Sequence, residues 1–143
     1  MPDLTLTQAQ SIVIAALAEA RRLTLKPMVV VVLDSRGAYK ALAAEDGTSL
    51  KRAEIAHGKA HGALALGMGS RAIAKRAVEQ AYFVAAVSNV VGGALIPVPG
   101  GVLVRDGAGE LVGAVGLSGD TSDNDEAAAM AGITVAGLVG DPG

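Results

Sequence analysis

The chain has 143 residues, of which 51% are hydrophobic and 18% charged, with a mean hydropathy of +0.45 and a formal net charge of −2. This length suits one layered core, so we expect residues 1–143 to form a single domain. Basic residues are adjacent only in pairs such as Arg21–Arg22 and Lys51–Arg52, which argues against nucleic-acid binding. The absence of cysteine excludes disulfides, thiolate ligands and a cysteine nucleophile.

The apolar residues are mostly small, because aromatic residues make up only 2% of the chain and glycine contributes 19 residues. So few charges suggest that apolar surface is covered by another copy, and we expect a homo-oligomer. The longest apolar stretch, Ala81 to Val98, contains Gly92 and Pro97 and does not read as a membrane span. We therefore expect no membrane partner. The start, Met1 to Asp3, is not that of a signal peptide, which favours a cytoplasmic location by default.

The first elements in chain order are a helix and a hairpin. Leu4 to Arg22 has the spacing of an amphipathic helix, and Thr5 and Gln8 have the spacing of a capping box. Met28 to Leu33 is too apolar for a half-exposed strand and predicts a buried central strand. After a short turn, Ala38 to Ala43 returns as its hairpin partner.

Two helices follow the hairpin. Thr48 or Ser49 can cap the first, which we expect over Leu50 to Leu66. The second runs from Ser70 to about Gln80. Residues 81–91 are ambiguous between helix and strand.

The remaining elements are a hairpin and a last helix. Val102 to Arg105 and Glu110 to Leu117 read as strands joined by a glycine-rich turn. The last helix is expected over Asp125 to Leu138, with two alternative N-terminal caps, Ser122 with Asp125 or Asp123 with Glu126. Counting one strand in the apolar stretch after residue 80, the order is α, β, β, α, α, β, β, β, α. The hairpins predict an α+β fold, an antiparallel sheet with helices packed on it.

The segment Pro97 to Glu126 is the first candidate functional region. Gly100 and Gly101 lack a Cβ, so the backbone there can approach a ligand. Glycines then recur at a spacing of three, at Gly113, Gly116 and Gly119. Such glycines mark either close packing or a backbone floor under a ligand, and the spacing alone leaves both open. The helix N-terminus that follows suits an anionic group such as a carboxylate.

The two histidines are the second candidate. His57 and His61 are the only ones in the chain, and their i, i+4 spacing puts them on one helix face. Such a pair can chelate a metal or offer an axial ligand to haem, with Glu54 as a candidate third metal ligand. The alternative is a pair of ordinary surface or packing residues. No zinc-protease pattern is present.

Lys59 lies between the histidines in sequence but is rotated away from their face. It sits among small residues, so the lysine can be partly buried and can hold a carboxylate; these residues are Ala56, Gly58, Ala60, Gly62 and Ala63. The alternative is an ordinary lysine whose ammonium group reaches solvent along its aliphatic stem.

Several segments together carry a resemblance to a known family. In chain order they are Leu4 to Leu6, the hairpin at Val32 to Gly37, Ile55–Ala56 with Lys59–Ala60, Pro97 to Val102, Val112 to Gly119 and Asp125–Glu126. In this order they resemble the GlcG/HbpS family of haem-binding or "haem-degrading" proteins, which includes the C-terminal domain of PduO-type proteins. The resemblance covers nearly the whole chain.

The resemblance implies a profilin-like antiparallel sheet of about five strands with packed helices, and homo-oligomers. It also implies a ligand site near Lys59 and the Pro-Gly-Gly strand. The cofactor-binding residues expected from it are Pro99, Gly100, Gly101, Gly116 and Asp120. Some relatives bind haem, iron or corrinoid-related ligands. The family commonly has Ser-Gly-Gly before its last helix, where this chain has Ser118-Gly119-Asp120.

Three functions stay open at this point. The first, which the resemblance favours, is a binding protein for haem or another small molecule. The second is a small cofactor-independent enzyme that acts on an organic acid or carbonyl compound in catabolism. Its catalytic residues would be Lys59 and either His57 or His61 as general base. The third is an assembly subunit without chemistry of its own.

Overall fold

An open antiparallel sheet of five strands forms the centre of the protein. The computed structural model describes residues 3–143. In chain order the elements are α1 (Leu6–Arg22), β1 (Val29–Asp34), β2 (Tyr39–Ala44), α2 (Arg52–Leu66), α3 (Ser70–Glu79), α4 (Ala81–Val90), β3 (Gly101–Arg105), β4 (Leu111–Ser118), α5 (Ser122–Val135) and β5 (Val139–Asp141). The strand order is β2-β1-β4-β3-β5, and all neighbouring pairs are antiparallel. The predicted α+β class and antiparallel sheet are confirmed.

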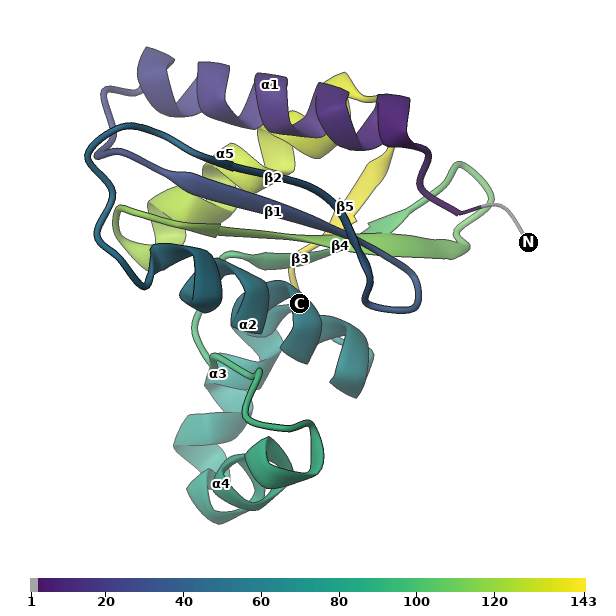
Figure 1. Ribbon diagram of the computed structural model, residues 1–143. Coiled ribbons are helices and arrows are strands. Elements are labelled where there is room, and N and C mark those ends of the chain that lie inside the picture. Colours follow the sequence, from purple (N-terminus) through teal and green to yellow (C-terminus); the bar gives the residue numbers. More distant parts are fainter. Residues whose placement is uncertain (1–2) are drawn as a thin grey trace.

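Helices cover both faces of this sheet. Figure 1 shows α1 and α5 on one face and α2 on the other. Strand β1 is buried throughout, as its apolar run predicted. Because side chains alternate along a strand, Val30 and Val32 join the core under α1 and α5, whereas Val29, Val31 and Leu33 join the core under α2.

The N-terminus of α1 is fixed by the predicted capping box. The Gln8 amide N–H donates to the Thr5 hydroxyl at 3.1 Å, and the Thr5 N–H donates to the Gln8 side-chain oxygen at 3.0 Å. These bonds satisfy N–H groups that have no partner within the helix. The inner face of α1 buries Ile12 and Ala16 against α5, where a Cβ on Gly132 would lie 2.8 Å from the carbonyl oxygen of Ile12.

The prediction of a strand in the apolar stretch after residue 80 is wrong. This stretch forms α4, whose side chains at Val84 and Val87, together with Val91 beyond its end, have helical spacing and pack beside Ile73. The fifth strand is instead β5, which pairs with β3 at the C-terminal end of the chain. Its residues follow the last helix, which ends at Val135 rather than Leu138.

Two helix starts also differ from the predictions. Helix α2 begins at Arg52 without a side-chain cap, because the Thr48 hydroxyl donates to the Glu45 carbonyl oxygen instead. Helix α5 begins at Ser122, and its cap is the Thr121 hydroxyl, which accepts from the Asn124 N–H at 3.3 Å. The acidic residues that we expected to cap it make other contacts: Asp123 and Glu126 pair with Arg71, and Asp125 is buried.

Helices α3 and α4 form an arm below α2, away from the sheet (Figure 1). Helix α4 packs chiefly on α3 and contains no charged residue. Val78, Tyr82 and Val90 expose large apolar side chains on this arm. Within residues 3–143, no helix is both long enough and apolar enough to cross a lipid bilayer.

Candidate functional site

The inner face of α2 lies directly on the sheet because its residues are small. Ala56 and Ala60 are fully buried there. A Cβ on Gly116 of β4 would collide with the carbonyl oxygen of Ala56, and a Cβ on Gly101 of β3 would collide with that of Lys59. The backbone of α2 therefore occupies the space above these two strand glycines.

Lys59 points from this inner face into the protein. Its Nζ donates to the Asp125 carboxylate at 3.0 Å and to the Leu117 carbonyl oxygen at 2.9 Å, and the two charged side chains are only 2% and 1% exposed. The Asp120 N–H donates to the other Asp125 oxygen at 2.9 Å. The lysine thus holds a carboxylate of the protein itself and ties α2 to β4 and α5.

Burial changes the titration of both partners. Loss of solvent lowers the pKa of Lys59, and the charge and hydrogen bond of Asp125 only partly oppose this effect. Loss of solvent likewise raises the pKa of Asp125. Both directions follow from the cost of burying a charge, which each partner offsets for the other.

The Pro-Gly-Gly segment closes over the same lysine. Pro99 is half-buried, and Gly100 follows it with φ +119°, a conformation that other residues rarely adopt. A Cβ on Gly100 would lie 2.9 Å from the Lys59 Nζ. The next N–H, of Gly101, donates to the buried Ser70 hydroxyl at 2.7 Å. The expected glycines do meet at Lys59, but protein atoms fill the space that their missing side chains leave.

The histidines lie on the outer face of α2, opposite Lys59. The rings of His57 and His61 stack with centroids 5.2 Å apart, and Tyr39 of β2 stacks on His57 at 5.0 Å. Burial, and secondarily the neighbouring His61, lowers the pKa of His57. The structure therefore brings the two histidines together and does not bring Lys59 to them.

One histidine is held by the backbone. His61 Nδ1 lies 2.9 Å from the carbonyl oxygen of Ala94 in the segment between α4 and β3. A carbonyl only accepts, so Nδ1 is the nitrogen that carries the proton, and Nε2 of the neutral ring keeps its lone pair. This is the state in which histidine binds a metal, with the other nitrogen fixed by a second hydrogen bond.

A complete metal site is not formed by these side chains alone. Within residues 3–143, no three histidine, aspartate or glutamate side chains gather around one point. Glu54, the expected third ligand, forms an ion pair with Lys51 at 2.9 Å. The histidine pair thus supplies two nitrogen donors and leaves other coordination positions to a cofactor or another ligand.

Asp120 lies in the loop between β4 and α5 with both oxygens in use. One accepts from the Lys26 N–H at 2.9 Å, and the other accepts from the Thr121 N–H and the Asn124 amide, both at 2.8 Å. These hydrogen bonds, that of Lys26 first, lower its pKa to about 2. The carboxylate of Asp120 thus links the β4–α5 loop to Lys26, in the segment before β1.

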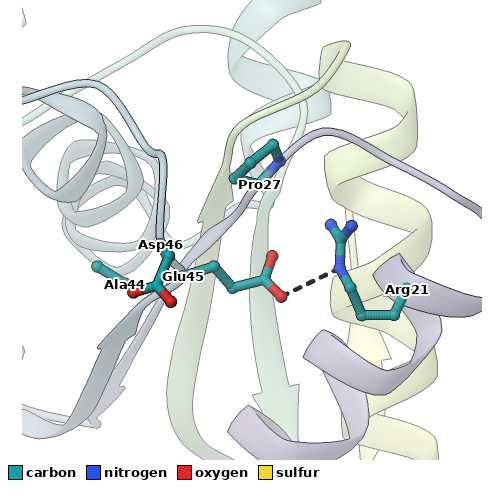
Figure 2. Close-up of a pocket in the computed structure, with 5 residues that line it drawn as sticks. All are labelled: Arg21, Pro27, Ala44, Glu45 and Asp46. Atoms are coloured by element: carbon teal, nitrogen blue, oxygen red, sulfur yellow. Dashed lines mark ion pairs between the residues drawn. The ribbon is translucent and has the colours of Figure 1, made fainter.

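A cavity of about 460 Å³ lies beside Pro27 at the end of β2. Figure 2 shows Arg21 and Glu45 pointing toward one another across it, and the Arg21 Nε lies 3.0 Å from the Glu45 carboxylate. Glu45 also accepts from the Met28 N–H at 2.8 Å. Arg21 and Glu45 satisfy each other, so this ion pair links α1 to the end of β2.

These features define a class of protein: an α+β domain with an open antiparallel sheet, a small-residue helix locked to it by a buried ion pair, and histidines on that helix's outer face. The family model described as "Haem degrading protein HbpS-like" matches residues 4–134. The chain therefore belongs to the HbpS-like family, and the predicted membership is confirmed. A search of curated proteins gives no significant match.

Solved structures agree with this assignment. A PduOC:heme complex has a TM-score of 0.85 at 22% identity, with 96% of this chain and 97% of that chain covered. A structure of HbpS has a TM-score of 0.81 at 25% identity, covering 94% and 91%. An HbpS double mutant from Streptomyces reticuli has a TM-score of 0.80 at 26% identity, covering 94% and 88%.

Three features of the site escaped the sequence reasoning. Asp125 was expected to be a helix cap. A buried lysine requires a buried partner of opposite charge, and this requirement could have linked Lys59 to Asp125. Tyr39 was not connected to His57, because the pairing of a strand residue with a helix residue depends on the fold. The bond from His61 to Ala94 has no sequence signal at all.

Proposed function

We propose that this protein binds haem on the outer face of α2, with His61 as axial ligand and His57 beside it. The observation that carries the proposal is the hydrogen bond between His61 Nδ1 and the Ala94 carbonyl oxygen. This hydrogen bond fixes the ring and leaves the lone pair of Nε2 available to coordinate iron, as in protein sites where a neutral imidazole ligates iron. Haem, when bound, would supply the iron and its redox chemistry.

The surroundings of His61 support a flat ligand. Tyr39, His57 and His61 form a continuous stack, and Tyr39 as a residue is 58% exposed. An exposed ring offers a π-face on which a macrocycle can pack. Burial lowers the pKa of His57, which favours the neutral form of this second imidazole. Family membership and the heme that the PduOC structure contains support the same ligand class.

A haemin titration tests the proposal. Purified protein is titrated with haemin, and the Soret band is followed. We expect a shifted band in the wild type, loss of the shift in His61→Ala, and a smaller change in His57→Ala. Val135→Ala, an exposed apolar position on α5, is the matched control for haem that merely adsorbs to apolar surface.

Two results would contradict haem ligation. One is a wild-type spectrum that is identical to free haemin. The other is a spectrum that stays unchanged in the double variant His57→Ala/His61→Ala, which contains no histidine.

We further propose that copies of the chain associate through the α3–α4 arm. The uncharged helix α4 and the exposed side chains of Val78, Tyr82 and Val90 support this role, because large exposed apolar groups on a small domain are usually covered by a partner. Light scattering after size exclusion would detect the assembly. Val90→Lys should lower the mass, and an unchanged mass for both Val90→Lys and Val78→Lys would exclude this surface.

A further inference from the structure

A small cavity of about 200 Å³ lies at the base of α2, away from the histidine face. It is bounded by the segment before β1, the turn before α2 and the start of the β4–α5 loop. The residues lining it are Lys26, Pro27, Gly47, Thr48, Ser49, Arg52 and Gly119. Pockets for drug-sized ligands usually measure roughly 300–1,000 Å³. This one therefore suits a compact molecule rather than a macrocycle.

Arg52 is the strongest group in this cavity. Its Nη1 donates to the hydroxyl of the buried Ser118 at 3.1 Å, and no carboxylate within residues 3–143 lies within ion-pair distance of it. Arg76 stacks on the Phe83 ring. The remaining arginines all pair with carboxylates: Arg21, Arg22, Arg36, Arg71 and Arg105. Arg52 is thus the arginine whose planar fork has no acidic or aromatic partner.

Three acidic groups near the cavity are already engaged, and the exposed Asp46, next to Gly47, forms no ion pair within residues 3–143. Asp120, next to Gly119, accepts hydrogen bonds from two backbone N–H groups and the Asn124 amide. Glu45 pairs with Arg21. Glu54 pairs with Lys51 at the surface. None of these carboxylates neutralises Arg52.

The positive charge of Arg52 also acts on the buried lysine behind the cavity. The positive charge of Arg52 is one of the causes that lower the pKa of Lys59, after burial, so the two cations act on each other. Asp125 is the carboxylate paired with Lys59. An anion beside Arg52 would relieve this repulsion.

We propose that this cavity binds a small oxyanion, through a carboxylate or phosphate group held by Arg52. A guanidinium presents two parallel N–H donors to such a group. The hydroxyl of Ser49 adds a donor, whereas that of Thr48 already donates to Glu45. Lys26 supplies a second positive charge at the wall. The site is separate from the histidine face, and its existence does not depend on haem binding.

The neighbouring cavity provides an internal control. It shares Pro27 with the Arg52 cavity, but its arginine, Arg21, is paired with Glu45 (Figure 2). A ligand drawn only by positive surface charge would respond equally to the loss of Arg21 and of Arg52. A ligand held in the Arg52 cavity would respond to Arg52 alone.

The test is a titration of isotope-labelled full-length protein, with amide chemical shifts as the readout. Sodium oxalate and inorganic phosphate are titrated separately, with ionic strength held constant by sodium chloride. We expect saturable shifts at Ser49, Arg52 and Gly119 with at least one of the two anions. Saturation by oxalate alone assigns a carboxylate ligand, and saturation by phosphate alone assigns a phosphate ligand. Arg52→Gln should weaken binding about tenfold or more, and Arg21→Gln should leave it unchanged.

The proposal is overturned if neither anion gives saturable shifts, or if Arg52→Gln binds like the wild type. Equal losses of anion affinity in Arg52→Gln and Arg21→Gln would also overturn it, because they would indicate non-specific attraction to positive charge. Thermal melts establish that each variant is folded. If Arg52→Gln does not fold, Ser49→Glu replaces it, because this exposed position puts a carboxylate at the mouth of the cavity. If Ser49→Glu then binds the anion as tightly as the wild type does, the site is excluded.

Discussion

The two faces of the fifteen-residue helix α2 differ in how they are packed. On the inner face, alanines and one buried lysine bring the helix backbone onto the strand glycines Gly101 and Gly116, and protein atoms fill the space. On the outer face, two imidazoles and the Tyr39 ring stack in partly exposed positions, and the Nδ1 of His61 is held by the Ala94 carbonyl oxygen. Close packing on one side thus provides the fixed platform from which the other side can present ligands.

The largest effect should come from breaking the buried ion pair of the inner face. Lys59→Met leaves Asp125 buried without its cation, and we expect a loss of about 3–5 kcal/mol in the free energy of unfolding. Urea unfolding followed by circular dichroism measures this loss. The double variant Lys59→Met/Asp125→Leu removes both charges and should recover much of it. A single variant as stable as the wild type would mean that the pair does not lock the helix.

A methyl group between α2 and the sheet should have the next largest effect. Gly116→Ala places a Cβ against the Ala56 carbonyl oxygen, and the overpacking should cost about 2–3 kcal/mol. Gly107→Ala is the matched control, because a Cβ at that turn would meet nothing within 4 Å. Equal unfolding midpoints for the two variants would contradict the close approach of α2 to β4.

A smaller effect should appear in the acid dependence of stability, at the loop that borders the inner face. The pKa of Asp120 is about 2 in the folded protein, below its ordinary value of 3.8. A carboxyl with a lowered folded pKa stabilises the protein above its unfolded pKa, and the contribution is lost as pH falls through the folded value. Urea midpoints between pH 4 and pH 2 should therefore fall less steeply in Asp120→Asn. Parallel slopes for the variant and the wild type would argue against this role.

The smallest effect on stability should come from the outer face. His57→Ala and His61→Ala remove partly exposed rings and should each change the free energy of unfolding by no more than about 0.5 kcal/mol. The same two variants are expected to change the haem spectrum. A loss of stability comparable to that of Lys59→Met would show that the histidines are structural and would abolish the contrast between the faces.

Much of the fold was readable from local patterns. The apolar run of β1, the capping box of α1 and the glycine turn between β3 and β4 each determine an element with few alternatives. The error at α4 arose because a short apolar run suits both a strand and a helix, and only its packing against Ile73 decides. Strand β5 has three residues, Val139–Asp141, too few for any period to emerge.

The site was less predictable because its contacts join distant residues. The burial of Lys59 follows from its small neighbours, and this part of the hypothesis agrees with the structure. Its partner, Asp125, lies 66 residues further along the chain, and only the packing of α5 brings it near. The tautomer of His61 likewise depends on where the chain passes between α4 and β3.

The attachment of α4 has a consequence for motion. Because this helix packs chiefly on α3, it can unfold without separating any strand of the sheet. Its backbone amides should therefore exchange with deuterium through local opening, whereas those of β1 and β4, buried between two helical layers, should exchange only when the whole protein unfolds. Chain association through the arm would slow exchange in α4 selectively, so its deuterium uptake would report how much of the protein is assembled.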